Sequence, residues 1–328
     1  MYSLEQSSQD FATLWGYSVG FYGVWIAHIG RQMRLFDHIA SRPLSIEELI
    51  RTTEFYPAAV RAWCIAAQSY RFVTTKHGKL HLKNQMKHML IDTSSIDYMG
   101  GQFSYLALRS LEYADFEKLF KFGKTTKMSN SLNAVQQATD WDHYAFLAMA
   151  RDDKKLNGLL SKGCWLLDVG CGTGSMISKL QSKYPNSRFV GIDPSIKAIS
   201  SARKITGAKR ATILKGSGES MKFTDEFEIV FLCETLYATK DKQKVLANCW
   251  RALKDHGTIL IIEGLLPQSK FDNPTSQLMM GMQLDFAFQG KEFMNKKDIV
   301  LLLKNNNFSA IRFEHLGGNV YLVAAMKK

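Results

Sequence analysis

Residues 166–174 read Leu-Leu-Asp-Val-Gly-Cys-Gly-Thr-Gly, and this stretch is the part of the chain best suited to hold a ligand. The apolar residues around Asp168 predict a short buried strand, and the apolar spacing after the loop predicts a helix. Between them, Gly170, Gly172 and Gly174 leave a backbone that a ligand can approach closely, because glycine has no Cβ atom. Strand, glycine loop and helix in this order open a βαβ unit that binds a nucleotide-like cofactor.

The glycine spacing separates two kinds of cofactor. A dinucleotide loop has the pattern G-x-G-x-x-G, whereas this loop is G-x-G-x-G and has Asp168 two residues before its first glycine. A carboxylate there would repel a pyrophosphate and suit a cationic group, such as the ammonium of a methionine moiety. The next predicted strand, residues 188–192, is followed by Asp193, which is positioned to accept both hydroxyls of a ribose.

The segments Leu166-Leu-Asp-Val-Gly-Cys-Gly-Thr-Gly174 and Val190-Gly-Ile-Asp-Pro194 closely resemble the class I S-adenosylmethionine-dependent methyltransferases. The resemblance implies an α/β fold with a Rossmann-like, seven-stranded sheet whose last strand is antiparallel. It also implies S-adenosyl-L-methionine as the cofactor and methyl transfer as the reaction. In this part of the chain the expected cofactor-binding residues are Asp168, Gly170, Cys171, Gly172, Gly174, Asp193 and Pro194.

Two further strand ends are expected to complete the cofactor site. In relatives the third strand is followed by a segment resembling Gly-Asp-Ala-Glu-x-Leu-Pro-Phe, and here Ser217 stands where that Asp would be. A hydroxyl can accept the same hydrogen bond from the adenine amine but brings no charge. We therefore expect the adenine contact from Ser217, the Gly218 backbone or Glu219, with an ordinary exposed turn as the alternative. Cys233, at the end of the fourth strand, is expected to line the sulfonium side.

The general base is the main departure from the family pattern. Plant-type O-methyltransferases of this architecture use a histidine just after the fourth strand, but the segment here is Glu234-Thr-Leu-Tyr-Ala-Thr-Lys-Asp241. A phenol, with a pKa of about 10, usually needs a base at neutral pH. The candidate catalytic residues are Glu234, Tyr237 and His143, followed by Tyr144 and Asp285. Each also has a structural role as its alternative. Transfer without a base suits an acidic oxygen, an amine or a stabilised carbanion, so O-methylation is favoured and C- or N-methylation stays open.

The acceptor is expected to be small and fairly apolar. Residues 278–288 are rich in Met and aromatic side chains, and Met adapts well to irregular apolar surfaces. Together with aromatic residues near the N-terminus they predict an apolar acceptor chamber. Packing in the core or at a dimer interface is the equal alternative.

The N-terminal part predicts a winged-helix domain. A helix over residues 11–36 is followed by a capping box of Ser45 and Glu48, a helix opened by Pro57, and a hairpin whose turn contains Gly78. This order resembles the N-terminal domain of winged-helix small-molecule O-methyltransferases, where the domain dimerises and covers the acceptor. We therefore expect residues 1–140 to form a helical dimerisation and substrate-lid domain, residues 141–328 to form the methyltransferase domain, and the protein to be a homodimer.

The remaining elements follow from the apolar patterns. Residues 94–122 are expected to be helical, residues 123–131 to form a mobile loop, and residues 141–160 to form one connecting helix. Strands are expected near Trp165, Phe189, Thr212, Glu228, Thr258, Phe308 and Val320, with helices between most of them. Residues 294–306 are the last expected helix.

Composition limits the alternatives. The net charge is +12, and residues 156–328 hold 24 Lys and Arg against 15 Asp and Glu. We interpret this excess as a solvated basic surface in preference to a nucleic-acid site. Five cysteines without a C-x-x-C pair predict neither disulfides nor a metal site and favour a reducing cytoplasm. Residues 11–30 carry no charged side chain but are interrupted by glycines, which favours a buried helix over a membrane span, and residues 1–10 do not resemble a signal peptide.

Three other functions stay open. A winged-helix DNA-binding regulator could use the cofactor domain as a sensor, although its reading helix at residues 57–70 would carry only Arg61 and Arg71 at its margins. A nucleic-acid methyltransferase is indicated only by the basic second half and lacks an Asn/Asp-Pro-Pro-Tyr-type motif. A non-methylating enzyme that binds the same cofactor is compatible with the absent histidine.

Overall fold

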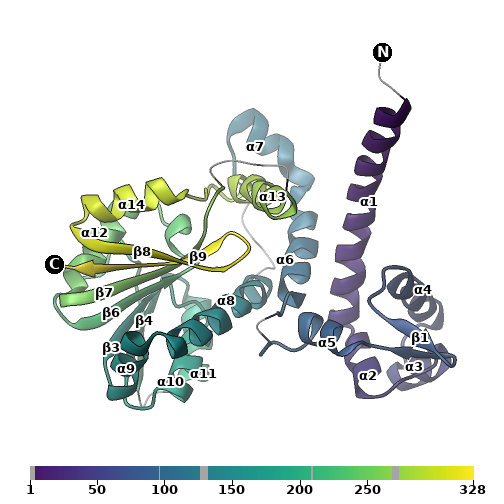
Figure 1. Ribbon diagram of the computed structural model, residues 1–328, viewed down its shortest axis with the longest axis horizontal. Helices are drawn as coiled ribbons and strands as arrows, with labels where there is room; N and C mark the ends of the chain where they lie inside the picture. Colours follow the sequence, from purple (N-terminus) through teal and green to yellow (C-terminus); the bar gives the residue numbers. More distant parts are fainter. Residues whose placement is uncertain (1–3, 96, 126–131, 208–209, 268–272) are drawn as a thin grey trace. The chain divides into compact units, whose positions relative to one another are not determined.

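The computed structural model describes residues 4–95, 97–125, 132–207, 210–267 and 273–328 (Figure 1). The chain forms two compact units. The first consists of Met1–Ala114 and Ser129–Trp141, and the second of Asp115–Met128 and Asp142–Lys328. Each unit has its own buried core. The lid and dimerisation roles expected for residues 1–140 stay predictions.

The first unit has the element order expected from the sequence. Ser45 and Glu48 form a complete capping box at the start of α3, and Pro57 is the first residue of α4, so both helix-start predictions are confirmed. His77 and Gly78 both have positive φ in the hairpin turn between β1 and β2. The elements are α1 (Leu4–Gln32), α2 (Leu35–Ser41), α3 (Ile46–Thr53), α4 (Pro57–Ser69), β1 (Thr74–Lys76), β2 (Lys79–His81), α5 (Asn84–Leu90) and α6 (Gly100–Ser110).

Arg31 near the end of α1 joins three parts of this unit. Its guanidinium donates to the backbone carbonyls of Leu90 (2.8 Å) and Gly100 (2.5 Å), and to the hydroxyls of Ser104 and Tyr98. Burial lowers the pKa of Arg31, but five donors on one planar group still satisfy these acceptors together. The end of α1 is therefore fixed to α5 and α6.

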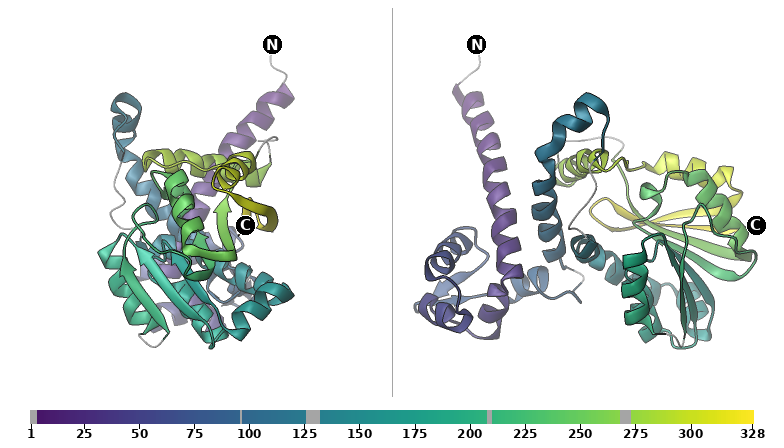
Figure 2. Two further views of the ribbon diagram at one scale, coloured as in Figure 1. Left: turned by 90° about the vertical axis from the view of Figure 1, so that its left-hand side faces the viewer. Right: turned by 180° about the vertical axis from the view of Figure 1, so that it is seen from behind.

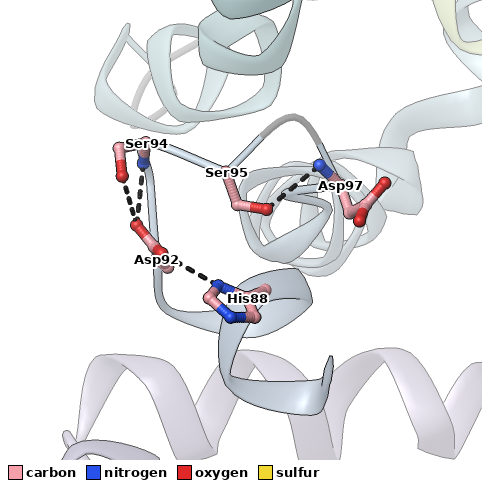
Figure 3. Close-up of polar contacts among 5 residues, drawn as sticks. All are labelled: His88, Asp92, Ser94, Ser95 and Asp97. Atoms are coloured by element: carbon pink, nitrogen blue, oxygen red, sulfur yellow. Dashed lines mark hydrogen bonds and ion pairs between the residues drawn. The ribbon is translucent and has the colours of Figure 1, made fainter. Parts of the chain in front are cut away.

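The turn that follows α5 is held by short-range polar contacts (Figure 3). The carboxylate of Asp92 accepts hydrogen bonds from the Ser94 hydroxyl (2.6 Å) and backbone N–H (3.1 Å) and lies 3.1 Å from Nδ1 of His88. The Ser95 hydroxyl accepts from the backbone N–H of Asp97 at 3.1 Å. In this arrangement Asp92 lies between Ser94 and His88, so these contacts order a turn and do not activate the serine hydroxyl.

Helix α4 has little charge with which to read DNA. Arg61 is the only charged residue of this helix, and its guanidinium forms a two-pronged ion pair with Glu47 of α3. Recognition helices usually present several polar side chains to the bases, so the charge of this helix does not favour DNA binding.

The second unit contains the predicted seven-stranded sheet. Its strand order is β5-β4-β3-β6-β7-β9-β8; the first five of these strands are parallel, and β9 is antiparallel to both of its neighbours. All seven expected strands are confirmed, including the antiparallel last strand. They are β3 (Trp165–Val169), β4 (Arg188–Asp193), β5 (Ala211–Lys215), β6 (Phe227–Cys233), β7 (Leu253–Gly264), β8 (Phe308–Gly317) and β9 (Val320–Lys327).

Helices cover both faces of this sheet, which Figure 1 and the right-hand view of Figure 2 show from opposite directions. Neighbouring residues such as Leu166 and Leu167 point to opposite faces, as the alternation of a strand requires, so that both faces are buried. One face packs on α12 (Lys242–Ala252) and α14 (Lys296–Asn305). The other face packs on α9 (Lys154–Lys162), α10 (Ser175–Lys183), α11 (Ile196–Thr206) and the C-terminal part of α8 (Leu132–Asp152).

Three sequence-based boundaries were wrong. The single helix expected over residues 141–160 is two helices, α8 and α9, because the Asp153 side chain accepts the N–H groups of Lys155 and Leu156 and starts a new helix. The helix expected over residues 11–36 ends at Gln32, where Arg34 adopts positive φ before α2. The helical stretch at 94–122 divides into α6, a 3-10 turn and α7 (Phe116–Phe122). Most of the loop expected at 123–131 lies outside the described residues.

Gly101 provides a test of packing in the first unit. A Cβ atom at this position of α6 would lie 1.8 Å from the backbone oxygen of Gln137, whereas a Cβ at Gly20 of α1 would meet nothing within 4 Å. We expect Gly101→Ala to lower the free energy of unfolding by about 1–3 kcal/mol, because backbone cannot yield as a side chain can. Gly20→Ala, the matched control, should raise it by about 0.5–1 kcal/mol. Urea titration of both variants measures this, and equal stabilities would contradict the close approach of α6 to Gln137.

Candidate active site

The glycine loop lies between the end of β3 and the start of α10. Gly170, Gly172 and Gly174 all have positive φ, at 79°, 52° and 81°. A Cβ at Gly170 would lie 2.5 Å from the Thr235 side chain, and one at Gly174 would lie 3.0 Å from Ala202. A Cβ at Gly172 would meet nothing within 4 Å. Two of the glycines therefore permit close packing, and the middle one leaves open space at the loop surface.

Asp193 holds this loop from the neighbouring strand. One oxygen of its carboxylate accepts the N–H of Gly172 at 3.0 Å, and the other accepts the N–H of Ser195 at 2.8 Å. Burial raises the pKa of Asp193, although these two bonds favour the ionised form. Each carboxylate oxygen has a second lone pair, so Asp193 can still accept hydrogen bonds from a vicinal diol.

Asp168 lies inside β3, between Gly191 of β4 and Phe231 of β6 in the strand register. Its side chain is only 3% exposed. Burial raises the pKa of Asp168 to about 7, and the nearby charge of Asp193 adds to the shift. A cation bound here would lower that pKa again, so the site favours a positively charged ligand.

Two other residues expected to bind the cofactor differ in their surroundings. Cys171 is buried, and its sulfur packs against Gly191 of β4. A Cβ at Gly191 would lie 2.8 Å from this sulfur, so a side chain at position 191 would not fit. Burial raises the pKa of the Cys171 thiol, which keeps it neutral. Pro194 is exposed beside Asp193, and the side chain of Ile196 is exposed on the same turn.

The loop after β5 is held by a residue that the sequence analysis missed. Asn248 of α12 donates from its amide nitrogen to the carbonyls of Gly218 (2.9 Å) and Glu219 (3.0 Å). The Asn248 amide oxygen accepts from Arg251 at 2.8 Å. A Cβ at Gly218 would lie 2.9 Å from Val245, so this glycine is required for packing. An asparagine on an otherwise apolar, buried helix face was the available signal.

The other two predicted cofactor residues in that loop, Ser217 and Glu219, form hydrogen bonds to nearby residues. The hydroxyl of Ser217 lies 3.2 Å from that of Ser220, and a carboxylate oxygen of Glu219 accepts the N–H of Lys240 at 3.2 Å. Both side chains are half-buried. Ser217 and Glu219 therefore lie on one ordered turn at the carboxyl end of β5.

Glu234 and Glu263 connect the ends of β6 and β7 reciprocally, and we call this pair the carboxyl clasp. The carboxylate of Glu234 accepts the N–H of Gly264 at 3.0 Å. That of Glu263 accepts the N–H groups of Thr235 (3.1 Å) and Leu236 (2.5 Å). Glu234 has a φ of 48°, a conformation that few non-glycine residues adopt, and its own N–H donates to Ile262.

The carboxyl clasp is an unusual electrostatic arrangement. Glu263 is fully buried, and its Oε2 atom has no hydrogen-bond partner among the described residues. Burial raises the pKa of both carboxyls, and the charge of Glu234 raises that of Glu263 further. Two such groups so close together do not both ionise readily, so at neutral pH the pair retains a proton. Glu263 was not among the sequence candidates. The signal for it was a carboxylate ending the apolar run of residues 259–262.

The other predicted catalytic residues come from different elements. Tyr237 lies on the 3-10 turn after β6 and stacks on Phe286 of α13 (Pro274–Phe288), with ring centroids 4.6 Å apart. Met279, Phe286 and Phe293 complete a small buried cluster with Tyr237. Asp285 is buried on the same helix and accepts from Gln289.

His143 lies on α8, where its side chain is buried. Its neighbour Tyr144 faces α10, because the Lys179 ammonium lies 5.1 Å from the centre of its ring. Cys233 ends β6 next to Glu234, and burial raises the pKa of its thiol well above the usual range. Within the described ranges, no cluster of His, Cys, Asp or Glu is arranged to hold a metal ion.

Comparison with known proteins shows what the second unit is similar to. Residues 167–261 match the family model described as "Methyltransferase domain". The chain is 28% identical over 202 residues to desmethyl-yatein O-methyltransferase of Sinopodophyllum hexandrum, a match that covers 60% of this chain and 55% of that protein. The match thus spans little more than half of the relative's length.

Two solved structures have the same fold. Human N-acetylserotonin methyltransferase, solved in complex with SAM, superposes with a TM-score of 0.72 at 18% identity and covers 100% of this chain and 99% of its own. Mitomycin 7-O-methyltransferase gives a TM-score of 0.71 at 14% identity, with coverage of 99% and 100%. The chain therefore has the fold of these two proteins, and residues 167–261 of its second unit are similar to methyltransferase domains.

The residues present fit S-adenosylmethionine. The open backbone at Gly172 admits a ligand, no positive group among the described residues acts on the buried Asp168, and Asp193 retains lone pairs for a diol. These are the groups that an ammonium and a ribose require.

The burial of Asp168 predicts how the stability of the protein depends on pH. Because its folded pKa is raised, its contribution to stability is present at low pH and is lost as the pH rises through about 7. We expect ligand-free Asp168→Asn to melt several degrees above the wild type at pH 8, with a smaller difference at pH 5. Scanning calorimetry at both pH values measures this, with the exposed Asp255→Asn as control. A pH-independent difference would contradict the buried, uncompensated carboxyl.

Proposed function

We propose that this protein transfers the methyl group of S-adenosylmethionine to an oxygen of a small, fairly apolar acceptor. The observation that carries the proposal is the open Gly172 backbone between the carboxyls of Asp168 and Asp193, in a fold shared with O-methyltransferases. A relative with 28% identity is named for O-methylation of desmethyl-yatein. When bound, S-adenosylmethionine supplies an electrophilic methyl group on a sulfonium.

The chain's own residues bind and orient the donor. Asp168 would face its ammonium, Asp193 would accept its ribose hydroxyls, and the backbone of Gly172 would lie against it. The turn at residues 217–219, which Asn248 fixes, would contact its adenine. Cys233 would line the sulfonium side. Holding the donor and the acceptor in line and excluding water is the principal catalytic contribution.

Glu234 is our first choice for the residue that accepts the acceptor's proton, ahead of Tyr237 and His143. The raised pKa of Glu234 matches a general base that works near neutral pH. Tyr237, three residues after Glu234, packs with Phe286 and Phe293 in a buried aromatic cluster, and such apolar surroundings suit an aromatic acceptor.

We further propose that the protein is a homodimer joined through α1. Leu14 and Trp15 lie three and four residues after Phe11, and Tyr22 lies seven after Trp15, so all four form one stripe along the helix, and each is more than 60% exposed. A continuous apolar stripe of this size on a protein surface marks an interaction site. None of the described helices is long and apolar enough to cross a membrane. The unpaired state of all five cysteines supports a cytoplasmic location.

The proposed activity is tested with Asp193→Ala. We expect this variant to bind S-adenosylmethionine more weakly by about 1–3 kcal/mol, because hydrogen bonds to the ribose are lost. Isothermal titration calorimetry measures the affinity, with Asp255→Ala as the control. Transfer of a radiolabelled methyl group to small phenols and to a cell extract then measures the reaction. A wild-type protein that binds no donor would contradict the proposed function, and unchanged affinity of Asp193→Ala would contradict the ribose assignment.

Substitutions in the exposed apolar stripe of α1 test the proposed dimer. Deleting α1 would remove Ile26 and Ala27 from the core of the first unit, so point substitutions are preferable. We expect Trp15→Glu to shift the protein from dimer to monomer in sedimentation velocity experiments, because a charge cannot be buried in an apolar interface without large cost. Thr13→Glu, on the opposite side of the helix, should leave the dimer intact. A monomeric wild type, or a dimer unaffected by Trp15→Glu, would refute the proposal.

A further inference from the structure

We propose that the carboxyl clasp of Glu234 and Glu263 senses ligand charge, so that the site prefers the sulfonium donor over the neutral thioether product, S-adenosylhomocysteine. Donor binding, in this account, expels the proton that the two carboxyls share. The inference rests on the proposed function and adds to it a means of limiting product inhibition.

The carboxyl clasp is connected to the glycine loop through Thr235. Glu263 fixes the backbone of Thr235, and the Thr235 side chain lies where a Cβ at Gly170 would come within 2.5 Å of it. The glycine loop therefore packs against the turn that the clasp holds, without space for an intervening side chain. A ligand that rests on the loop lies on the same strand ends as the two carboxyls.

The clasp is short of positive charge. Glu263 Oε2 is buried and has no hydrogen-bond partner in the described part of the chain, and no lysine or arginine of that part acts on the pKa of Asp168 or Glu234. A buried carboxylate without a cation is costly, so the pair retains a proton instead. Glu263 accepts its two backbone N–H bonds at Oε1 and Glu234 accepts one, so the buried pair has fewer hydrogen-bond donors than two carboxylates require.

Other titratable groups surround the same point. Asp142 of α8 and Asp168 of β3 join Glu234 and Glu263 in raising the pKa of the Cys233 thiol, after burial itself. All four are carboxyls, and they come from α8, β3, β7 and the turn after β6, so the charged groups that act on Cys233 at the end of β6 are acidic. A positive charge is therefore stabilised here, and a neutral sulfur is not.

The donor and the product differ in one charge. Both carry the ammonium that Asp168 faces, so this contribution cancels in a comparison of the two ligands. Only the donor carries the sulfonium charge, which favours full ionisation of the clasp and release of its proton. The thioether leaves the clasp protonated. Linkage then requires that donor affinity rises relative to product affinity as the pH increases through neutrality.

The experiment is calorimetric titration at pH 7 in two buffers that differ in ionisation enthalpy, which counts the protons released on binding. The ligands are S-adenosylmethionine, S-adenosylhomocysteine and sinefungin, which carries an amine in place of the sulfonium methyl. We expect the two cationic ligands to release more protons than S-adenosylhomocysteine and to bind about tenfold more tightly, the equivalent of one pKa unit. Equal proton release by all three ligands would overturn the inference.

Glu234→Gln isolates the clasp, because its amide oxygen can still accept the N–H of Gly264. We expect this variant to bind the donor and the product with affinities within about twofold and to lose the extra proton release. Glu263→Gln is the second variant if Glu234→Gln does not fold. Glu226→Gln, an exposed carboxyl at the opposite end of β6, makes the same charge change and should behave as the wild type. A preference retained in both clasp variants would overturn the inference. Failure of the wild type to bind any of the ligands would instead overturn the proposed function.

Discussion

Burial of acidic side chains at the carboxyl ends of the central strands is the constraint on which the rest of the site depends. The cost of removing a carboxylate from water must be compensated by hydrogen-bond donors, a proton or a cation. Asp193 and Glu263 accept hydrogen bonds from backbone N–H groups of the loops that they hold. Asp168 has no such donor among the described residues, and burial raises its pKa to about 7. A cationic cofactor supplies the positive charge that compensates the Asp168 carboxylate.

The same contacts explain why the loops have their shapes. Each loop at this edge of the sheet is fixed by a side chain from another element: the glycine loop by Asp193, the turn after β6 by Glu263, and the turn after β5 by Asn248. Glycines then allow the loops to touch one another and the helices beneath them. Loops that are fixed by such contacts lose less conformational entropy when a ligand binds.

Local sequence patterns predicted the elements well and the contacts between them poorly. The strand that contains Asp168, the loop glycines and the capping box of Ser45 all follow from residues close together in sequence. The clasp does not, because Glu263 meets Thr235 only after the sheet has brought β6 and β7 together. Asn248 was missed for the same reason. The break between α8 and α9 was missed because Asp153 interrupts an apolar pattern that continues across it. Gly170 and Gly174 were interpreted as ligand contacts, whereas their neighbours show that packing also requires them.

The central claim is that the donor binds at the acidic carboxyl ends of the central strands, where Gly172 leaves open space. A crystal structure of the protein grown with S-adenosylhomocysteine tests this most directly. The account predicts electron density with the ligand's ammonium beside Asp168 and its ribose hydroxyls on Asp193. Crystals in which the ligand occupies another surface, or in which this edge binds a pyrophosphate instead, would contradict it.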